Sequence, residues 1–233
     1  MKRVSAVALL VMLLYPCFSE ASDDTYVFIS GGVNLIDTID MPVFFENESV
    51  NSDVEVDTKS GLSLNGGAGL RISDNYRLEA ELGYRSAEID TVDITHMYMV
   101  DKNVYGGSGD IACFSAMVNA WYDFTFMKYL VPYVGIGIGA GQVRIENFSM
   151  NWIRVRGAIQ PNQGEAEFVD DNNWQFAFQA GIGVGIELMK NLSLDLGYRY
   201  FATTDPEFTD THGNKFSIKY NHSDFLAGIK FLF

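Results

Sequence analysis

Apolar and polar side chains alternate along much of the chain, most clearly over residues 76–88. Successive residues of a β-strand point to opposite faces, so a period of two predicts a strand with one apolar and one polar face. Charged residues and glycine fill the other positions of this segment. The apolar positions are Tyr76, Leu78, Ala80, Leu82 and Tyr84.

The same alternation recurs and predicts eight strands. They span residues 25–35, 59–72, 76–88, 110–124, 131–144, 173–188, 192–201 and 216–233. Short turns follow the second, fourth and sixth strands, whereas residues 37–57, 90–107, 146–172 and 202–215 form long polar connections. Bacterial outer-membrane barrels have an even strand number, short periplasmic turns and long outer loops. The predicted fold is all-β, an eight-stranded antiparallel transmembrane β-barrel with four long external loops.

The last predicted strand changes its apolar parity. Residues 225–233 place Phe225, Ala227, Ile229, Phe231 and Phe233 on one face. Apolar residues at 216, 218 and 220 fall on the opposite parity. Because side-chain direction follows the period of two, we expect either a bulge near residues 221–223 or a segment lying above the membrane.

Tyrosine and tryptophan recur near the predicted strand ends, as in the aromatic belts at membrane interfaces. One group contains Tyr76, Trp121, Tyr122 and Tyr133, and the other contains Tyr84, Trp174, Tyr198 and Tyr200.

The composition supports an exported all-β protein. Glycine is abundant (22), aromatic residues reach 14%, charged residues 20%, and the mean hydropathy is +0.04. Residues 1–21 combine Lys2, Arg3, an apolar run and Ser19-Glu20-Ala21, which predicts an export signal peptide. Residues 22–233 then form one barrel domain. Cys17 lies in the signal, so Cys113 is left without an intramolecular disulfide partner.

The charge balance excludes nucleic acid as an expected partner. Loss of residues 1–21 changes the formal charge from −14 to −15, because that segment carries Lys2, Arg3 and Glu20. Acidic residues concentrate in the long connections, which predicts a solvated outer surface.

Three motifs resemble a known family. Residues 121–124 (WYDF), 132–137 (PYVGIG) and 194–200 (LDLGYRY) resemble strand motifs of small OmpA-like and opacity-type outer-membrane proteins. The resemblance covers essentially the whole mature chain. It implies an eight-stranded barrel in the bacterial outer membrane, with surface-exposed loops used in adhesion, immune exposure or narrow conduction. It also implies contact with membrane lipid and lipopolysaccharide, and in some cases with host surface molecules. The peptidoglycan-binding domain of full-length OmpA has no counterpart here.

The closing strand is similar to the family's assembly signal, which the barrel-assembly machinery binds. The residues that carry this likeness are Phe225, Ile229, Phe231 and Phe233.

Charged residues fall on the polar faces of the strands, which would line the lumen. An eight-stranded barrel has an interior just wide enough for side chains to fill. Buried charges need partners, so we favour a plug of ion pairs over a proton or ion path. The predicted lumen residues are Arg71, Arg77, Glu79, Glu81, Arg85, Asp123, Glu187, Asp195, Arg199, Asp224 and Lys230.

One basic and aromatic stretch interrupts the acidic connections. It contains Trp152, Arg154 and Arg156. Trp and Arg are enriched at binding hot spots, so this stretch is the candidate site for a partner or a lipopolysaccharide phosphate. The alternative is a β-ribbon that extends a neighbouring strand.

No catalytic, cofactor or metal residue is predicted. The candidate bases are His96, His212 and His222, but His222 and Ser223 are strand neighbours and point apart. Residues 135–141 match a dinucleotide fingerprint, yet more strand follows them instead of a helix. Residues 96–99 offer one imidazole and two thioethers, which fits an apolar loop tip better than a metal site.

The preferred function is a non-enzymatic outer-membrane surface protein that presents acidic loops. The alternatives are a narrow porin, a lipid-modifying barrel enzyme and a soluble lipocalin-like carrier.

Overall fold

The computed structural model describes most of the chain after the predicted signal peptide. It covers residues 24–36, 39–44, 51–95, 103–127, 129–150, 152–155, 158–161, 168–169, 174–204, 207–210, 215–217 and 220–233. These residues include no helix that is long and apolar enough to cross a membrane. The strands are β1 (Thr25–Ile36), β2 (Ile39–Phe44), β3 (Asn51–Thr58), β4 (Gly61–Arg71), β5 (Tyr76–Thr95), β6 (Asn103–Asp123), β7 (Leu130–Met150), β8 (Trp152–Val155), β9 (Ala158–Pro161), β10 (Phe168–Val169), β11 (Gln175–Met189), β12 (Leu192–Thr203), β13 (Glu207–Asp210), β14 (Lys215–Ser217) and β15 (Asn221–Leu232).

Eight of these strands close into a barrel. Their antiparallel order is β1-β4-β5-β6-β7-β11-β12-β15, and β15 pairs back with β1. The closing register runs from Tyr26 opposite Leu232 to Ile36 opposite His222. Closure pairs the backbone groups of every barrel strand, as a hydrocarbon environment requires. The predicted fold class is confirmed.

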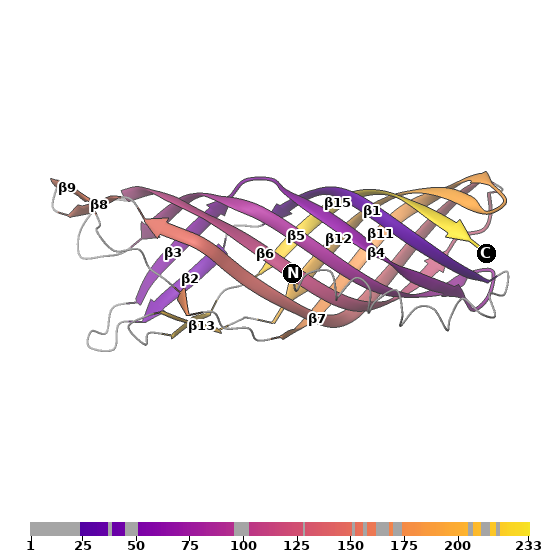
Figure 1. The fold of residues 1–233 in the computed structure, drawn as a ribbon, viewed down its shortest axis with the longest axis horizontal. Coiled ribbons are helices and arrows are strands. Elements are labelled where there is room, and N and C mark those ends of the chain that lie inside the picture. The colour runs from indigo at the N-terminus through magenta and orange to yellow at the C-terminus, as the bar shows by residue number, and fades with distance from the viewer. Residues whose placement is uncertain are drawn as a thin grey trace, which may run out of the picture.

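The two ends of the barrel differ. The short turns and the C-terminus lie at the right-hand end of Figure 1, which we call the turn end. The strands β2, β3, β8, β9 and β13 lie toward the other end, which we call the outer end. Short turns are periplasmic in outer-membrane barrels, which predicts that the outer end faces the cell exterior.

The long outer connections contain β-structure of their own, because strand pairing continues beyond the barrel. The strand β3 pairs with β5, and β2 pairs with β3. The strands β8 and β9 form a hairpin, and β10, β13 and β14 form a small sheet. Residues 53–57 alternate acidic residues with valine, which is itself a strand pattern. Their acidity suggested a solvated loop and obscured the period of two.

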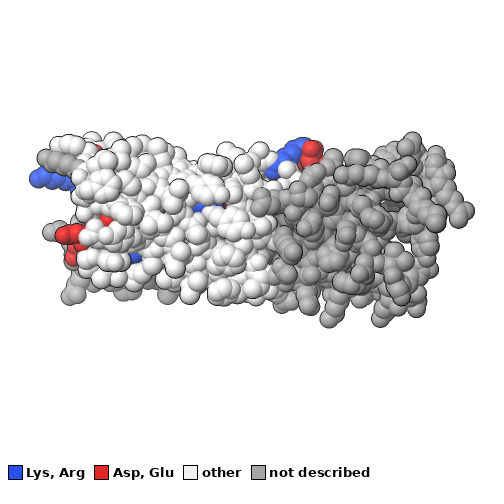
Figure 2. Space-filling view, turned by 180° about the vertical axis from the view of Figure 1, so that it is seen from behind, with Lys and Arg blue, Asp and Glu red and all other residues white. Residues whose placement is uncertain are grey.

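The outside of the barrel is apolar over its middle. Leu62 is 71% exposed and Ile136 is 67% exposed, and isoleucine, leucine, valine and phenylalanine on other strands share this surface. Figure 2 shows one face as a mostly white band between charged groups at its left end and a charged pair where the grey region begins. An apolar band with charges at its limits fits a lipid bilayer.

Two residues of the predicted aromatic belts do not lie at a membrane interface. Trp121 and Tyr133 are buried inside the lumen, whereas Tyr76 and Trp174 are exposed on the outside. The parity of β6 and β7 points the first two inward, where each finds a carboxylate partner. A buried indole N–H or phenol O–H normally makes a hydrogen bond.

The parity change before the last strand involves no bulge at residues 221–223. The strand β15 pairs with β1 and β12 in continuous register. Tyr220 is buried and packs against Phe201 and His222. Phe216 belongs to β14, which pairs with β13 outside the barrel. The inward side chain of Tyr220 is thus part of the interior.

Candidate functional site: the barrel lumen

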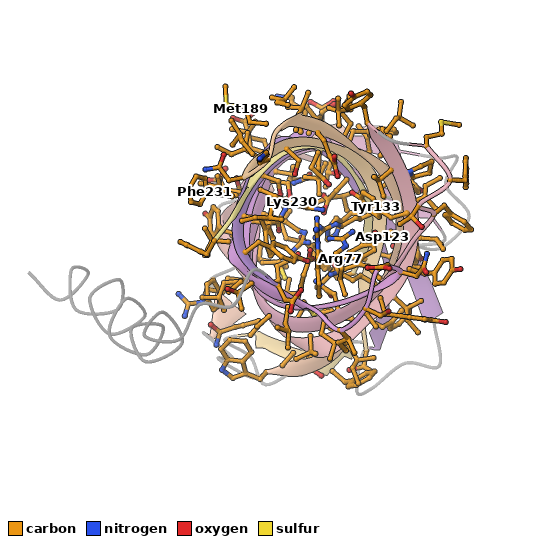
Figure 3. All side chains as sticks on the ribbon, turned by 90° about the vertical axis from the view of Figure 1, so that its right-hand side faces the viewer. Arg77, Asp123, Tyr133, Met189, Lys230 and Phe231 are labelled. Carbon is orange, nitrogen blue, oxygen red and sulfur yellow. The ribbon has the colours of Figure 1, made fainter. Side chains whose placement is uncertain are left out.

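The lumen is lined by the polar faces of the eight barrel strands. Figure 3 looks in from the turn end and shows Arg77, Asp123, Tyr133 and Lys230 pointing into it, with Met189 and Phe231 outside. The interior is described below in four levels, from the turn end to the outer end.

The first level, which we call the inner layer, is centred on Arg77 and Glu79 of β5. Arg77 Nε lies 2.6 Å from Asp123 Oδ2, and its Nη1 lies 2.9 Å from Glu79 Oε1. Tyr26 O–H donates to Glu79 Oε1 at 2.7 Å, and Trp121 Nε1 donates to Glu79 Oε2 at 2.6 Å. Both oxygens of this buried carboxylate therefore accept hydrogen bonds.

A second cluster at this end joins β7, β12 and β15. Lys230 Nζ lies 2.6 Å from Asp195 Oδ2, and Tyr133 O–H donates to Asp195 Oδ1 at 2.6 Å. The Lys230 ammonium also lies 4.8 Å from the centre of the Tyr133 ring, within range of a cation–π contact.

The middle layer contains Glu81, Asn119, Gln179 and Arg199. Arg199 Nη1 pairs with Glu81 Oε2, which also accepts from Asn119 Nδ2 at 3.2 Å. Gln179 Nε2 donates to Asn119 Oδ1 at 2.6 Å. Glu81 of β5 and Arg199 of β12 come from strands four positions apart in the closed eight-strand order, so this layer spans the lumen.

The outer charged layer contains Arg85, Asp224, Ser115 and His222. Arg85 Nε lies 2.9 Å from Asp224 Oδ2, and Arg85 Nη1 donates to Ser115 Oγ at 2.9 Å. His222 Nε2 lies 3.5 Å from the same Asp224 oxygen. Arg85, Asp224 and His222 are each 0% exposed.

An apolar layer, which the sequence reasoning missed, covers the charged layers at the outer end. The Phe201 ring stacks on His222 at 4.9 Å and lies 4.4 Å from the Arg85 guanidinium. The sequence does contain a signal for this layer. At the outer ends of the strands, the positions that point into the lumen carry apolar side chains instead of charged ones. Its buried members are Ala87, Ile89, Ile111, Cys113, Val143, Ala177, Phe201 and Tyr220.

The structure brings nine of the eleven predicted lumen charges into ion pairs inside the barrel. These are Arg77, Glu79, Glu81, Arg85, Asp123, Asp195, Arg199, Asp224 and Lys230. Arg71 and Glu187 instead line a cavity of about 40 Å³ at the turn-end mouth. Neither belongs to an ion pair formed among the described residues.

Glycines on the lumen face give space to large neighbours. A Cβ on Gly135 would lie 2.2 Å from the Trp121 ring, and one on Gly183 would lie 2.3 Å from Tyr133 Oη. The glycines at 135, 137, 139 and 141 lie within β7, so residues 135–141 do not open a helix.

The other candidate residues do not form a catalytic or metal site among the described residues. His222 is fully buried, whereas Ser223 Oγ lies 2.9 Å from Tyr198 Oη on the outer face. No metal-binding group of three or more histidine, cysteine or acidic residues occurs in the described ranges. His96, His212 and Arg156 lie outside the described residues, and Trp152 and Arg154 belong to β8.

Comparison with known proteins identifies the family. A model of the family described as "Outer membrane protein beta-barrel domain" matches residues 5–231. The chain belongs to this outer-membrane β-barrel family. Its location is therefore the bacterial outer membrane.

Similar sequences agree with this assignment. An uncharacterized protein of Brucella abortus is 30% identical over 151 residues, which cover 61% of this chain and 51% of that protein. The chain thus spans about half the length of the curated relatives it matches first. Outer membrane protein PagN of Salmonella typhimurium is 24% identical over the whole of both chains. Opacity protein opA65 of Neisseria gonorrhoeae is 27% identical over 56% of this chain and 62% of that protein.

Solved structures of outer-membrane barrels share the fold. OprG from Pseudomonas aeruginosa matches with a TM-score of 0.57 and 13% identity, over 91% of this chain and 99% of that one. The outer membrane protease OmpT from Escherichia coli matches with a TM-score of 0.52 and 10% identity, over 92% of this chain and 99% of that one. At these identities the likeness concerns the fold alone.

Proposed function

We propose that this protein is a non-enzymatic surface protein whose sealed barrel anchors outer β-structure in the membrane. The segments beyond the outer end would contact molecules outside the cell. The observation that carries the proposal is the double seal of the lumen, by buried ion pairs and then by the apolar layer.

The double seal argues against a porin. The middle layer joins Glu81 and Arg199 across the lumen, and the side chains of the apolar layer are almost completely buried above it. A hydrated ion would have to separate desolvated charge pairs and then cross a dry layer. Each step is costly, because buried charges lose partners that water does not replace.

The outer strands support a binding role. Strand pairing continues along β5 and β6 to Ile94 opposite Asn103, well beyond the apolar band. Loops and strands carried on a rigid scaffold are common sites of recognition. The stretch with Trp152, Arg154 and Arg156 remains our candidate contact, since it combines cationic and aromatic residues in an acidic exterior.

Conductance distinguishes the anchor from the narrow porin. We expect wild-type protein in planar bilayers at neutral pH to stay at the background current. Reproducible single-channel steps that scale with the number of inserted barrels would contradict the sealed lumen and favour the porin.

Whole-cell binding tests the surface role. A non-adherent Gram-negative laboratory strain expressing the protein should bind cultured epithelial cells more than the empty-vector strain. Replacing residues 151–173 by a short Gly-Ser linker leaves the pairing of β6 with β7 intact and should reduce that binding. A linker in place of residues 96–102 is the matched control. Equal binding by the vector strain would refute the proposal.

An enzymatic role is tested with refolded protein. We expect no lipid esterase or acyl-transfer activity, because His222 is the one histidine among the described residues and has no solvent-exposed surface. Activity that disappears in His222→Gln would establish the lipid-modifying alternative.

A further inference from the structure

The seam that closes the barrel carries small polar side chains on its lumen face. Asn34 of β1 lies directly opposite Asp224 of β15. Four positions earlier on β1, Ser30 lies opposite Asn65 of β4. All four residues are at least nine-tenths buried. The seam therefore has a polar strip, shielded from solvent, along its inner surface.

Each of these four side chains has a buried oxygen without a hydrogen-bond partner among the described residues. The atoms are Ser30 Oγ, Asn34 Oδ1, Asn65 Oδ1 and Asp224 Oδ1. Buried polar atoms in native proteins are nearly always paired with protein or with bound water. Amide and carboxylate oxygens only accept hydrogen bonds, so neighbouring oxygens of this kind need a donor between them.

The Asn34 amide and most of the Arg85 guanidinium are already committed as donors. Asn34 Nδ2 donates to Leu62 O at 2.9 Å and to Ser86 O at 3.4 Å, and turning the amide over would forfeit both bonds. Arg85 uses Nε for Asp224 Oδ2 and Nη1 for Ser115 Oγ. Its Nη2 has no partner among the described residues, and the hydroxyls of Ser30 and Tyr220 are further unpaired donors of this region.

The absence of a side chain at Gly83 lets polar groups approach one another closely on the lumen side of this region. Gly83 lies opposite Asn65 on β5. A Cβ atom on Gly83 would lie 2.6–2.7 Å from three polar atoms, which are Arg85 Nη1, Asn65 Oδ1 and Ser115 Oγ. Polar atoms from β4, β5 and β6 thus converge over a residue without a side chain.

We propose that this polar strip is a binding site for a buried water cluster that links β1, β4, β5 and β15. Water supplies both donors and acceptors, so it can bridge Asn34 Oδ1 to Asp224 Oδ1 and Ser30 Oγ to Asn65 Oδ1. A bound cation is a poorer fit, because the Arg85 guanidinium already occupies the other oxygen of Asp224. The cluster extends the hydrogen bonding of the closing seam from the backbone to the side chains.

Nuclear magnetic resonance of the refolded barrel in lipid nanodiscs tests the site. We expect water cross-peaks at the side-chain amides of Asn34 and Asn65. Asn119 is the internal control, because its Nδ2 donates to Glu81 and its Oδ1 accepts from Gln179. Absence of water contacts at both Asn34 and Asn65 would overturn the proposal.

Two other results would contradict the proposal by indicating that something other than water satisfies these oxygens. A thermal midpoint that differs between sodium and potassium at equal ionic strength would indicate a bound cation. A carboxyl carbon shift showing a protonated Asp224 at neutral pH would indicate a direct hydrogen bond to Asn34.

A variant provides a second readout. Gly83→Ala places a methyl group where the polar atoms converge, so we expect the Asn65 water cross-peak to fall by at least half. Gly185→Ala is the matched control, since the nearest atom to its added Cβ is Val131 O at 3.7 Å. An undiminished Asn65 cross-peak in a folded Gly83→Ala barrel would contradict the placement. If the Gly83→Ala variant does not fold, the wild-type cross-peaks at Asn34 and Asn65 alone test the proposal.

Discussion

The strongest residue-scale feature is the pairing of charges that have no contact with solvent. Arg85 and Asp224 are both 0% exposed and lie 139 residues apart in the sequence. Lys59 and Glu88, by contrast, form an exposed ion pair at 3.4 Å. Breaking a buried pair leaves a desolvated charge without compensation, whereas exposed pairs contribute little.

Arg85→Met should therefore lower the free energy of unfolding by about 3–5 kcal/mol. The double variant Arg85→Met/Asp224→Leu should recover most of that loss, because no unpaired charge remains. Urea unfolding in detergent micelles provides the measurement. Lys59→Met is the exposed control, with an expected change below about 1 kcal/mol. A double variant no more stable than Arg85→Met would contradict this account.

Gly135→Ala should destabilise the barrel, because its Cβ would lie 2.2 Å from Trp121 Cε3 and 2.4 Å from Ala120 O. Overpacking of this kind costs about 1–3 kcal/mol. Gly185→Ala serves again as the control, because its added Cβ would make only an ordinary van der Waals contact with Val131 O, at 3.7 Å. Unfolding of the two variants in the same detergent should rank them in this order, and equal stabilities would be inconsistent with a filled lumen.

Strand parity accounts for what could be predicted at this scale. The period of two assigned Arg77, Glu79, Glu81 and Arg85 to one face of a single segment, and the structure pairs all four. The same period of two also placed Trp121 on the lumen face of its strand. Because tryptophan is common at membrane interfaces, it was instead predicted to belong to an aromatic belt. Which charge meets which could not be predicted, because Arg199 and Glu81 are 118 residues apart and meet only through closure.

At the scale of elements, the lumen contains two seals in series. The middle layer joins β5 and β12 through Glu81 and Arg199, and Phe201 of β12 lies above it with the apolar layer. The strands were predictable because their lipid-facing sides are apolar. The strands β2 and β3 were not, since acidic residues in this segment resemble a solvated loop.

Opening one seal should leave the barrel closed. We expect Phe201→Ala alone, and Glu81→Ala/Arg199→Ala alone, to stay near background current in planar bilayers. The triple variant should conduct more than either, because it weakens both the charged seal and the apolar layer, while the inner and outer charged layers keep their ion pairs. Phe231→Ala, on the lipid face, is the control. Full conduction through Phe201→Ala alone would mean that the charged layer is no barrier.

At the scale of the whole molecule, an apolar band encircles the barrel between two polar ends. Ile136 lies near the middle of β7's membrane-facing stretch, and Phe126 lies in a turn at one end; both are strongly exposed. A cationic side chain on the lipid face destabilises a barrel strongly at the bilayer centre and only slightly near the membrane interface.

Ile136→Arg should therefore make folding into lipid less favourable by about 2–4 kcal/mol, and Phe126→Arg by about 0–1 kcal/mol. Reversible folding into phospholipid vesicles, followed by tryptophan fluorescence, measures both. Similar costs for the two substitutions would place the bilayer elsewhere on the molecule.

Closure between β1 and β15 has a consequence for biogenesis. The first strand cannot complete its pairing until the last one has been synthesised and exported. The carboxylate that neutralises Arg85 also arrives with the last strand. A chain interrupted before β15 would therefore keep an open sheet edge and an uncompensated interior cation, both of which disfavour insertion. Only a chain that includes β15 can therefore form the closed barrel. Chains that lack this strand remain unfolded in the periplasm, where proteases can degrade them.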